Sequence, residues 1–148
     1  MSETFTTKSS EETVNLGKKL GQKLRGGEVI FLIGDLGGGK TQFAKGVALG
    51  LGIVETVVSP TFTIERIYTS PRHSREGGNL VMHHFDLYRL TNDREINEEI
   101  KEISESGVEI MLIEWPENLE GIQGLATTKI QFEHIDEDIR KITTEEIK

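Results

Sequence analysis

Residues 28–46 constrain the fold more than any other part of the chain, because they join an apolar run to a glycine-rich turn and a helix start. Five consecutive apolar residues at 29–33 predict a buried strand, and the apolar positions after residue 42 predict an amphipathic helix. Between them the chain matches the pattern G-x-x-x-x-G-K-[ST] at Gly34, Gly39, Lys40 and Thr41. A strand, a phosphate-binding loop and a helix in this order are typical of an α/β domain.

The chemistry of a bound polyphosphate explains the residue types in this loop. Several backbone N–H groups must point inward at close approach, which a glycine-rich turn permits. Lys40 adds a positive charge for the β- and γ-phosphates, and the Thr41 hydroxyl is suited to Mg²⁺. The helix that follows presents the positive end of its dipole. The loop therefore predicts a nucleoside triphosphate site with contacts at Asp35, Leu36, Gly37, Gly38, Gly39, Lys40, Thr41 and Gln42.

Three further residues are candidates for the metal and for catalysis. Nucleotide hydrolases take a carboxylate from the end of a neighbouring apolar strand, and Glu114 follows such a run, so we expect it to bind Mg²⁺ together with Thr41. Asp86 also ends a predicted strand, where it either positions a water molecule or caps a turn. Thr61 lies in the segment Ser-Pro-Thr-Phe, which is either a switch that senses the γ-phosphate or an ordinary turn.

The first predicted helix begins with a capping box formed by Ser9 and Glu12, followed by leucines at four-residue spacing. This helix either serves packing alone or brings Ser10 to the base of the nucleotide. A third helix, capped by Asp93, is expected at 93–104. Further strands are expected at 62–68, 80–85, 108–113, 129–134 and 139–144.

The polar residues 69–79 predict an exposed, mobile loop, and residues 145–148 predict a frayed tail. His83 and His84 are adjacent on a predicted strand, so their side chains face opposite sides and cannot chelate one metal. We expect one of them to be packed and the other to be exposed.

Composition narrows the class of protein further. The 148 residues suit a single domain, and 35% apolar with 28% charged residues is typical of a globular chain. The absence of cysteine excludes disulfides and thiolate catalysis and favours the reducing cytoplasm. We expect neither a signal peptide nor a membrane span. The formal net charge of −8 argues against direct DNA or RNA binding, so any RNA is expected to be reached through a partner protein.

Four blocks of the sequence together resemble one known family. They are GDLGGGKT at 34–41, SPTFT at 59–63, HFDLYRL at 84–90 and LIEWPE at 112–117. In this order they resemble the signatures of the TsaE family of bacterial ATPases. The resemblance covers about 100 residues, from the first helix to residue 117, and the four blocks are more specific than the phosphate loop alone. Compared with the hairpin connection usual in that family, residues 69–79 are longer, which implies an insertion there.

The resemblance implies a P-loop NTPase-type, three-layer α/β/α fold with a mixed, largely parallel central sheet. It implies that the chain binds ATP and Mg²⁺, with Lys40, Thr41 and Glu114 at phosphate and metal, a switch at Thr61, and ATPase function linked to Asp86. It also implies partnership with TsaD and TsaB in forming threonylcarbamoyladenosine at position 37 of tRNAs that read codons beginning with A. Slow turnover without partners is expected, because Arg89 is the one arginine-finger candidate in these blocks.

Three alternatives stay open at this point. A small-molecule P-loop kinase would need a lid, for which only residues 69–79 are suited. A GTPase-like switch lacks its Asn-Lys-x-Asp signature in this chain. A nucleotide-gated assembly module would need ATP binding, with hydrolysis incidental.

Overall fold

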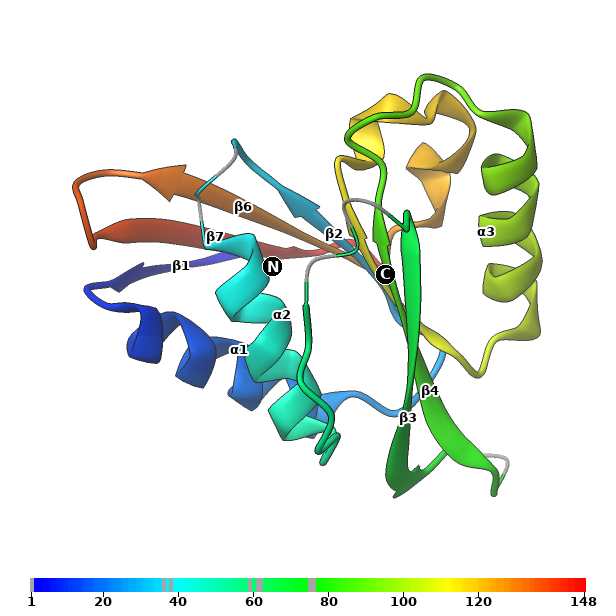
Figure 1. Ribbon diagram of the computed structural model, residues 1–148, viewed down its shortest axis with the longest axis horizontal. Coiled ribbons are helices and arrows are strands. Elements are labelled where there is room, and N and C mark those ends of the chain that lie inside the picture. Colours follow the sequence, from blue (N-terminus) through cyan, green and yellow to red (C-terminus); the bar gives the residue numbers. More distant parts are fainter. Residues whose placement is uncertain (1, 36, 38, 59, 61–62, 75–76) are drawn as a thin grey trace.

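Seven strands form one mixed sheet in the order β1-β7-β6-β2-β5-β4-β3 (Figure 1). The computed structural model describes residues 2–35, 37, 39–58, 60, 63–74 and 77–148. The four central strands, β6, β2, β5 and β4, run parallel to one another, and antiparallel strands extend the sheet at both edges. The strands are β1 (Ser2–Thr7), β2 (Val29–Ile33), β3 (Glu65–His73), β4 (Asn79–Asp86), β5 (Ile110–Glu114), β6 (Thr128–His134) and β7 (Arg140–Glu146).

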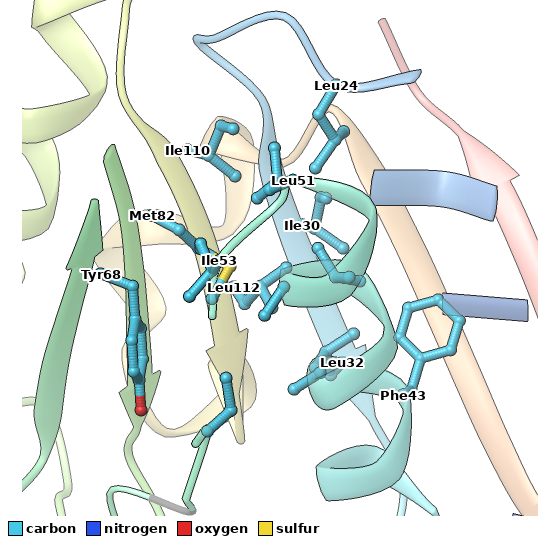
Figure 2. Close-up of a cluster of buried hydrophobic side chains, with 14 of the residues drawn as sticks. Leu24, Ile30, Leu32, Phe43, Leu51, Ile53, Tyr68, Met82, Ile110 and Leu112 are labelled. Atoms are coloured by element: carbon cyan, nitrogen blue, oxygen red, sulfur yellow. The ribbon is translucent and has the colours of Figure 1, made fainter. Parts of the chain in front are cut away.

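Helices cover both faces of the central strands, which confirms the predicted α/β fold (Figure 1). On one face lie α1 (Ser10–Lys23) and α2 (Lys40–Gly50); on the other lie α3 (Arg94–Ser106) and two 3₁₀ helices, η1 (Pro116–Asn118) and η2 (Glu120–Leu125). Strand β2 is buried on both sides, because alternate residues point into the two hydrophobic clusters. Figure 2 shows the cluster beneath α2. The outward side chains of β6 stay polar and exposed, so the third layer covers only part of the sheet.

The predicted helix caps are present. The Ser9 hydroxyl accepts a hydrogen bond from the Glu12 N–H at 3.1 Å, which begins α1. Asp93 caps α3 by accepting from the Ile96 N–H at 3.0 Å, and Gly107 ends that helix in the left-handed conformation with φ of 70°. Capping side chains therefore fix the first residues of α1 and α3.

Glycines on α1 and α2 bring the two helices into backbone contact. A Cβ atom added to Gly46 would lie 2.0 Å from the carbonyl oxygen of Val14, and one added to Gly17 would lie 2.2 Å from that of Phe43. Gly21 and Gly50 show the same close approach one turn further along. The helix that begins at the phosphate-binding loop therefore sets the position of α1.

The structure corrects the prediction of a long loop at residues 69–79. Residues 69–73 continue β3 at the edge of the sheet, and Asn79 already belongs to β4. An edge strand tolerates Pro71, because its outer side needs no N–H donor. The Arg72 guanidinium, expected in solvent, donates to three carbonyl oxygens, those of Gly21 at 2.9 Å, Leu24 at 2.8 Å and Gly50 at 3.1 Å. Because these carbonyls end α1 and α2, Arg72 ties both helices to the edge hairpin.

Three smaller predictions also need correction. Residues 2–7, for which no strand was predicted, form β1, and residues 145–146 belong to β7 rather than to a frayed tail. The strand expected from residue 62 begins at Glu65, because Ile64 turns the chain with φ of 68° and donates its N–H to the Pro60 carbonyl at 2.7 Å.

Both adjacent histidines are buried, His83 at 6% exposure and His84 at 0%, so the expectation that one is exposed is wrong. His83 lies within 2.7 Å of Glu65 and 2.9 Å of Glu109, and these carboxylates satisfy it beneath α3. The prediction that the two rings face opposite sides of the sheet holds, since their neighbours Met82 and Phe85 belong to different clusters. No helix in the described part of the chain is long and apolar enough to cross a membrane.

Candidate functional site

The phosphate-binding loop leads from β2 into α2 through glycines with left-handed backbone conformations. Gly37 has φ of 79° and Gly39 has φ of 97°, which favour glycine over residues with a side chain. Gly39 is the N-cap of α2 and offers no side-chain acceptor, so the first N–H groups of the helix receive no side-chain cap. A helix N-terminus of this kind, opened by left-handed glycines, is suited to an anion.

Lys40 is held at the centre of the site although it is 4% exposed. Its ammonium donates to the carbonyl oxygen of Gly34 at 2.6 Å and lies 4.3 Å from the centroid of the Trp115 ring. Burial lowers the pKa of Lys40, and the negative charges of Glu114 and Asp86 oppose this change. A partly desolvated ammonium that is turned toward a ring and a carbonyl favours an anionic partner.

Two acids lie side by side at the carboxyl ends of parallel strands. Asp86 ends β4 and pairs in register with Glu114, which ends β5. Glu114 is 4% exposed, and its Oε2 atom lies 2.7 Å from the Nε2 atom of His84. Asp86 accepts a hydrogen bond from the Tyr88 N–H at 3.0 Å, so its carboxylate also shapes the turn after β4.

The loop, the start of α2 and the two acids line one cleft of about 290 Å³. It brings together eight of the predicted site residues, Ser10, Gly37, Gly39, Lys40, Thr41, Gln42, Asp86 and Glu114. Asp35 is not among the lining residues, although its charge acts on Lys40. Leu36, Gly38 and Thr61, which were also predicted, lie outside the described residues.

The donor set in the cleft fits Mg²⁺ better than a metal that needs a complete protein cage. Among the described residues, no group of three or more histidine, cysteine, aspartate or glutamate side chains is arranged to hold a metal. Thr41 and Glu114 supply one hydroxyl and one carboxylate. Mg²⁺ is bound in nucleotide sites by one or two protein ligands together with water and phosphate oxygens.

Four lining residues were not predicted, and Arg140 is the most informative of them. Its Nη1 atom donates to the carbonyl oxygens of Asp136 at 3.1 Å and Glu137 at 3.0 Å, which holds the guanidinium against its own hairpin. Its Nε atom is buried without a partner among the described residues. Arg140 lies near Gly39, since a Cβ atom added there would be 3.7 Å from its Cγ atom. By contrast, Arg89, the sequence-based candidate, does not line the cleft.

The other three unpredicted residues are Ser9, Thr13 and Asp138. Only the capping box at Ser9 carried a local signal. Thr13, Asp138 and Arg140 lie near the loop because α1 and the β6–β7 hairpin pack there. No pattern of residues along the sequence predicts this packing.

Trp115 adopts a left-handed backbone conformation with φ of 59°, which is rare for a bulky residue. Its ring packs on Tyr88 at 5.0 Å between centroids and beneath the Lys40 ammonium. Non-glycine residues keep such conformations only where their surroundings impose them. The turn after β5 therefore places an aromatic face beneath the ammonium of Lys40.

Comparison with known proteins identifies the chain. A family model described as "Threonylcarbamoyl adenosine biosynthesis protein TsaE" matches residues 7–142. The chain belongs to the TsaE family. The prediction made from the four sequence blocks is confirmed, and the family's role lies in the biosynthesis of threonylcarbamoyladenosine in tRNA.

Relatives within the TsaE family align over much of the chain. The Treponema pallidum protein named "tRNA threonylcarbamoyladenosine biosynthesis protein TsaE" is 34% identical over 93% of this chain and 96% of its own length. The Nostoc protein of the same name is 42% identical over 74% of this chain, and the match spans 65% of that relative, just under two thirds. The crystal structure of Bacillus subtilis YdiB superposes with a TM-score of 0.72 at 31% identity, covering 97% of this chain and 84% of that one. The fold is therefore the P-loop NTPase-like fold of TsaE.

Proposed function

We propose that this chain binds ATP with Mg²⁺ in the cleft at the start of α2 and hydrolyses it in support of threonylcarbamoyladenosine formation. One observation carries the proposal: the loop lysine, the uncapped N-terminus of α2 and the two acids Asp86 and Glu114 line a single cleft. A triphosphate needs positive charge and N–H donors, and its metal needs oxygen ligands. The residues that line this cleft offer both.

The chain's own residues divide the work in the proposed reaction. Lys40 and the N–H groups of residues 37–41 bind the phosphates, and Thr41 and Glu114 hold Mg²⁺. Asp86 or Thr61 positions the water that attacks the γ-phosphorus in line, so that the bond to the leaving ADP oxygen breaks. Mg²⁺ supplies neutralisation of charge on the phosphate oxygens. Asp35, Leu36, Gly38 and Gln42 complete the loop contacts, and Ser10 approaches the nucleotide from α1.

Family membership and net charge support a proposal about the partners of this chain. We propose that TsaD and TsaB, in the cytoplasm, hold the tRNA that is modified at position 37, while this chain drives their conformational cycle. The formal net charge of −8 supports indirect contact with tRNA, because a phosphate backbone repels an acidic surface. No direct DNA contact and no membrane contact form part of the proposal.

The kinase alternative loses the feature that favoured it. It required residues 69–79 to serve as a lid, and residues 69–73 instead form part of β3 at the edge of the sheet. Transfer of phosphate to a metabolite in the absence of any partner protein would still restore this alternative.

Nucleotide binding can be tested through Trp115, the single tryptophan of the chain, whose ring lies beside Lys40. We expect ATP to change its fluorescence, and GTP to bind more weakly. Lys40→Ala removes a phosphate contact and should weaken ATP binding, whereas Lys45→Ala, on the same helix but outside the cleft, should not. Equal binding by the Lys40 variant, or tighter binding of GTP, would contradict the adenine nucleotide site.

Hydrolysis and partnership are tested by measuring ADP release with and without TsaD and TsaB. We expect slow release alone and faster release with both partners. Glu114→Gln should bind ATP and lose hydrolysis. If that variant still supports tRNA modification, the assembly-module alternative replaces the hydrolytic cycle. If TsaD and TsaB do not speed ADP release, their proposed role as partners is refuted.

A further inference from the structure

The carboxylate of Glu114 is held by a histidine from the neighbouring strand. His84 and Glu114 lie on the α2 side of β4 and β5, where Asp86 pairs directly with Glu114 and His84 lies two residues earlier. The Nε2 atom of His84 is 2.7 Å from Oε2 of Glu114. The His84 side chain is fully buried, and that of Glu114 is 5% exposed. A contact this buried fixes the side-chain rotamers of both residues.

The second ring nitrogen shows which hydrogen bond His84 makes. Nδ1 is buried and has no partner among the described residues. A carboxylate only accepts hydrogen bonds, so the contact needs a proton on Nε2, and a second proton on Nδ1 would be a buried donor without a partner among the described residues. The ring proton therefore resides on Nε2, and His84 donates to Glu114.

A positioning contact has a definite task in this cleft. Lys40 and Glu114 carry opposite charges and line the same space, and at low dielectric they would attract each other strongly. No ion pair within 4.0 Å joins them among the described residues. Lys40 is instead bound to the Gly34 carbonyl, and Glu114 is bound to His84. Each charge is held apart from the other, so each stays available to a ligand.

We propose that His84 is a positioning residue that orients the Glu114 carboxylate toward Mg²⁺ and keeps it from pairing with Lys40. The proposal rests on the proposed function, because it assigns a role at the metal side of the same site. An arginine or lysine at this position would place a permanent cation beside Glu114, whereas the imidazole N–H orients the carboxylate through one directed hydrogen bond.

Two variants separate this role from simple packing. His84→Leu fills the space without a donor. His84→Gln keeps an N–H group at a similar distance from the main chain. His83→Gln is the matched control, since His83 is a buried neighbour that faces α3 and contacts Glu65 and Glu109 instead of the site. Thermal melting of every variant establishes that it is folded.

The measurement is the dissociation constant of ATP, followed by Trp115 fluorescence, in EDTA and in saturating Mg²⁺. The ratio of the two constants reports how strongly the metal assists binding. We expect His84→Leu to lower this ratio about 10-fold or more, in line with the effect of groups that orient metal ligands. A smaller loss of affinity is expected in EDTA, because Glu114 can then pair with Lys40. His84→Gln should recover most of the ratio, and His83→Gln should retain all of it.

The outcomes distinguish the two proposals. An unchanged ratio in folded His84→Leu, a failure of His84→Gln to recover it, or an equal loss of affinity in EDTA would overturn the positioning role alone. An unmodified chain that binds no ATP would overturn the proposed function and this role with it. A second readout needs no nucleotide: ¹⁵N NMR of the ring should show the proton on Nε2, and a proton on Nδ1 would overturn the assignment.

Discussion

Replacing Gly46 with alanine tests whether backbone contact between α1 and α2 holds the nucleotide site together. The new Cβ atom would lie 2.0 Å from the Val14 carbonyl oxygen and 2.9 Å from the Lys18 nitrogen. Real Cβ contacts below 3.0 Å essentially do not occur, and both neighbours are main-chain atoms, so α1 must move as a unit by about 1 Å or more.

The size of the effect follows from two opposing terms. Alanine favours a helix over glycine by about 1 kcal/mol. Forcing a methyl group into a well-packed contact costs about 1–3 kcal/mol, and here no flexible side chain can yield, so we take the upper end. The expected net loss is about 2 kcal/mol, which corresponds to a decrease in Tm of roughly 4–8 °C for a chain of this size.

Urea unfolding and ATP binding measure the two consequences. The free energy of unfolding should fall, and ATP affinity should fall with it, because α1 carries the lining residues Ser9, Ser10 and Thr13. Gly124→Ala is the control, since nothing lies within 4 Å of its added Cβ atom, and it should change stability by less than about 0.5 kcal/mol. If Gly46→Ala is as stable as the Gly124 variant, backbone contact between the helices does not determine the packing.

Three further substitutions have clear expected outcomes. Lys40→Met should raise Tm at neutral pH while ATP binding is lost, because burial lowers the pKa of Lys40 and its charge therefore opposes folding. Because the unfolded state binds more protons at Lys40, the free energy of unfolding of the unmodified chain should rise relative to that of Lys40→Met as pH rises toward 10.5. The same pH dependence of unfolding in both proteins would contradict the lowered pKa. Burial and a hydrogen bond to Glu65 raise the pKa of Glu99. The unmodified chain should therefore lose stability relative to Glu99→Gln as pH rises above 4.5. Urea unfolding at several pH values measures this difference, and its absence would contradict the expected shift. Arg72→Ala should lower the free energy of unfolding by about 2–3 kcal/mol, because three helix carbonyls lose a charged donor. Arg72→Lys should recover only part of this loss. If Arg72→Ala leaves the free energy of unfolding unchanged, Arg72 does not hold the two helices to the edge hairpin.

The part of the site that consecutive residues form could be predicted from the sequence. Strand β2, the loop glycines, Lys40 and the start of α2 follow one another without interruption, and the backbone conformations that the motif requires are present. Glu114 and Asp86 could be predicted because a parallel sheet brings the carboxyl ends of its strands to one edge. Each of these inferences needs only a local pattern and one general rule of topology.

The rest depends on contacts between residues far apart in the chain. Arg140 follows Gly39 by about 100 residues and reaches it only because the β6–β7 hairpin extends the sheet beside β2. Strand β1 was missed because its alternating polar residues carry no hydrophobic signal, and pairing with β7 supplies its order. Residues 69–73 were taken for a loop because an edge strand with one open face can be polar, and Arg72 finds its partners on two distant helices.

The contact between α1 and α2 limits which parts of the site can respond to a nucleotide. Interlocking main chains prevent the two helices from sliding, and Arg72 fastens both of their C-terminal ends, so this wall of the cleft has few internal degrees of freedom. The ends of β4 and β5 are built differently, since Ile64 and Trp115 beside them adopt left-handed backbone conformations. Under the proposed function, the parts of the site that respond to a change from ATP to ADP are therefore expected at the ends of β4 and β5, while α1 and α2 stay fixed relative to each other.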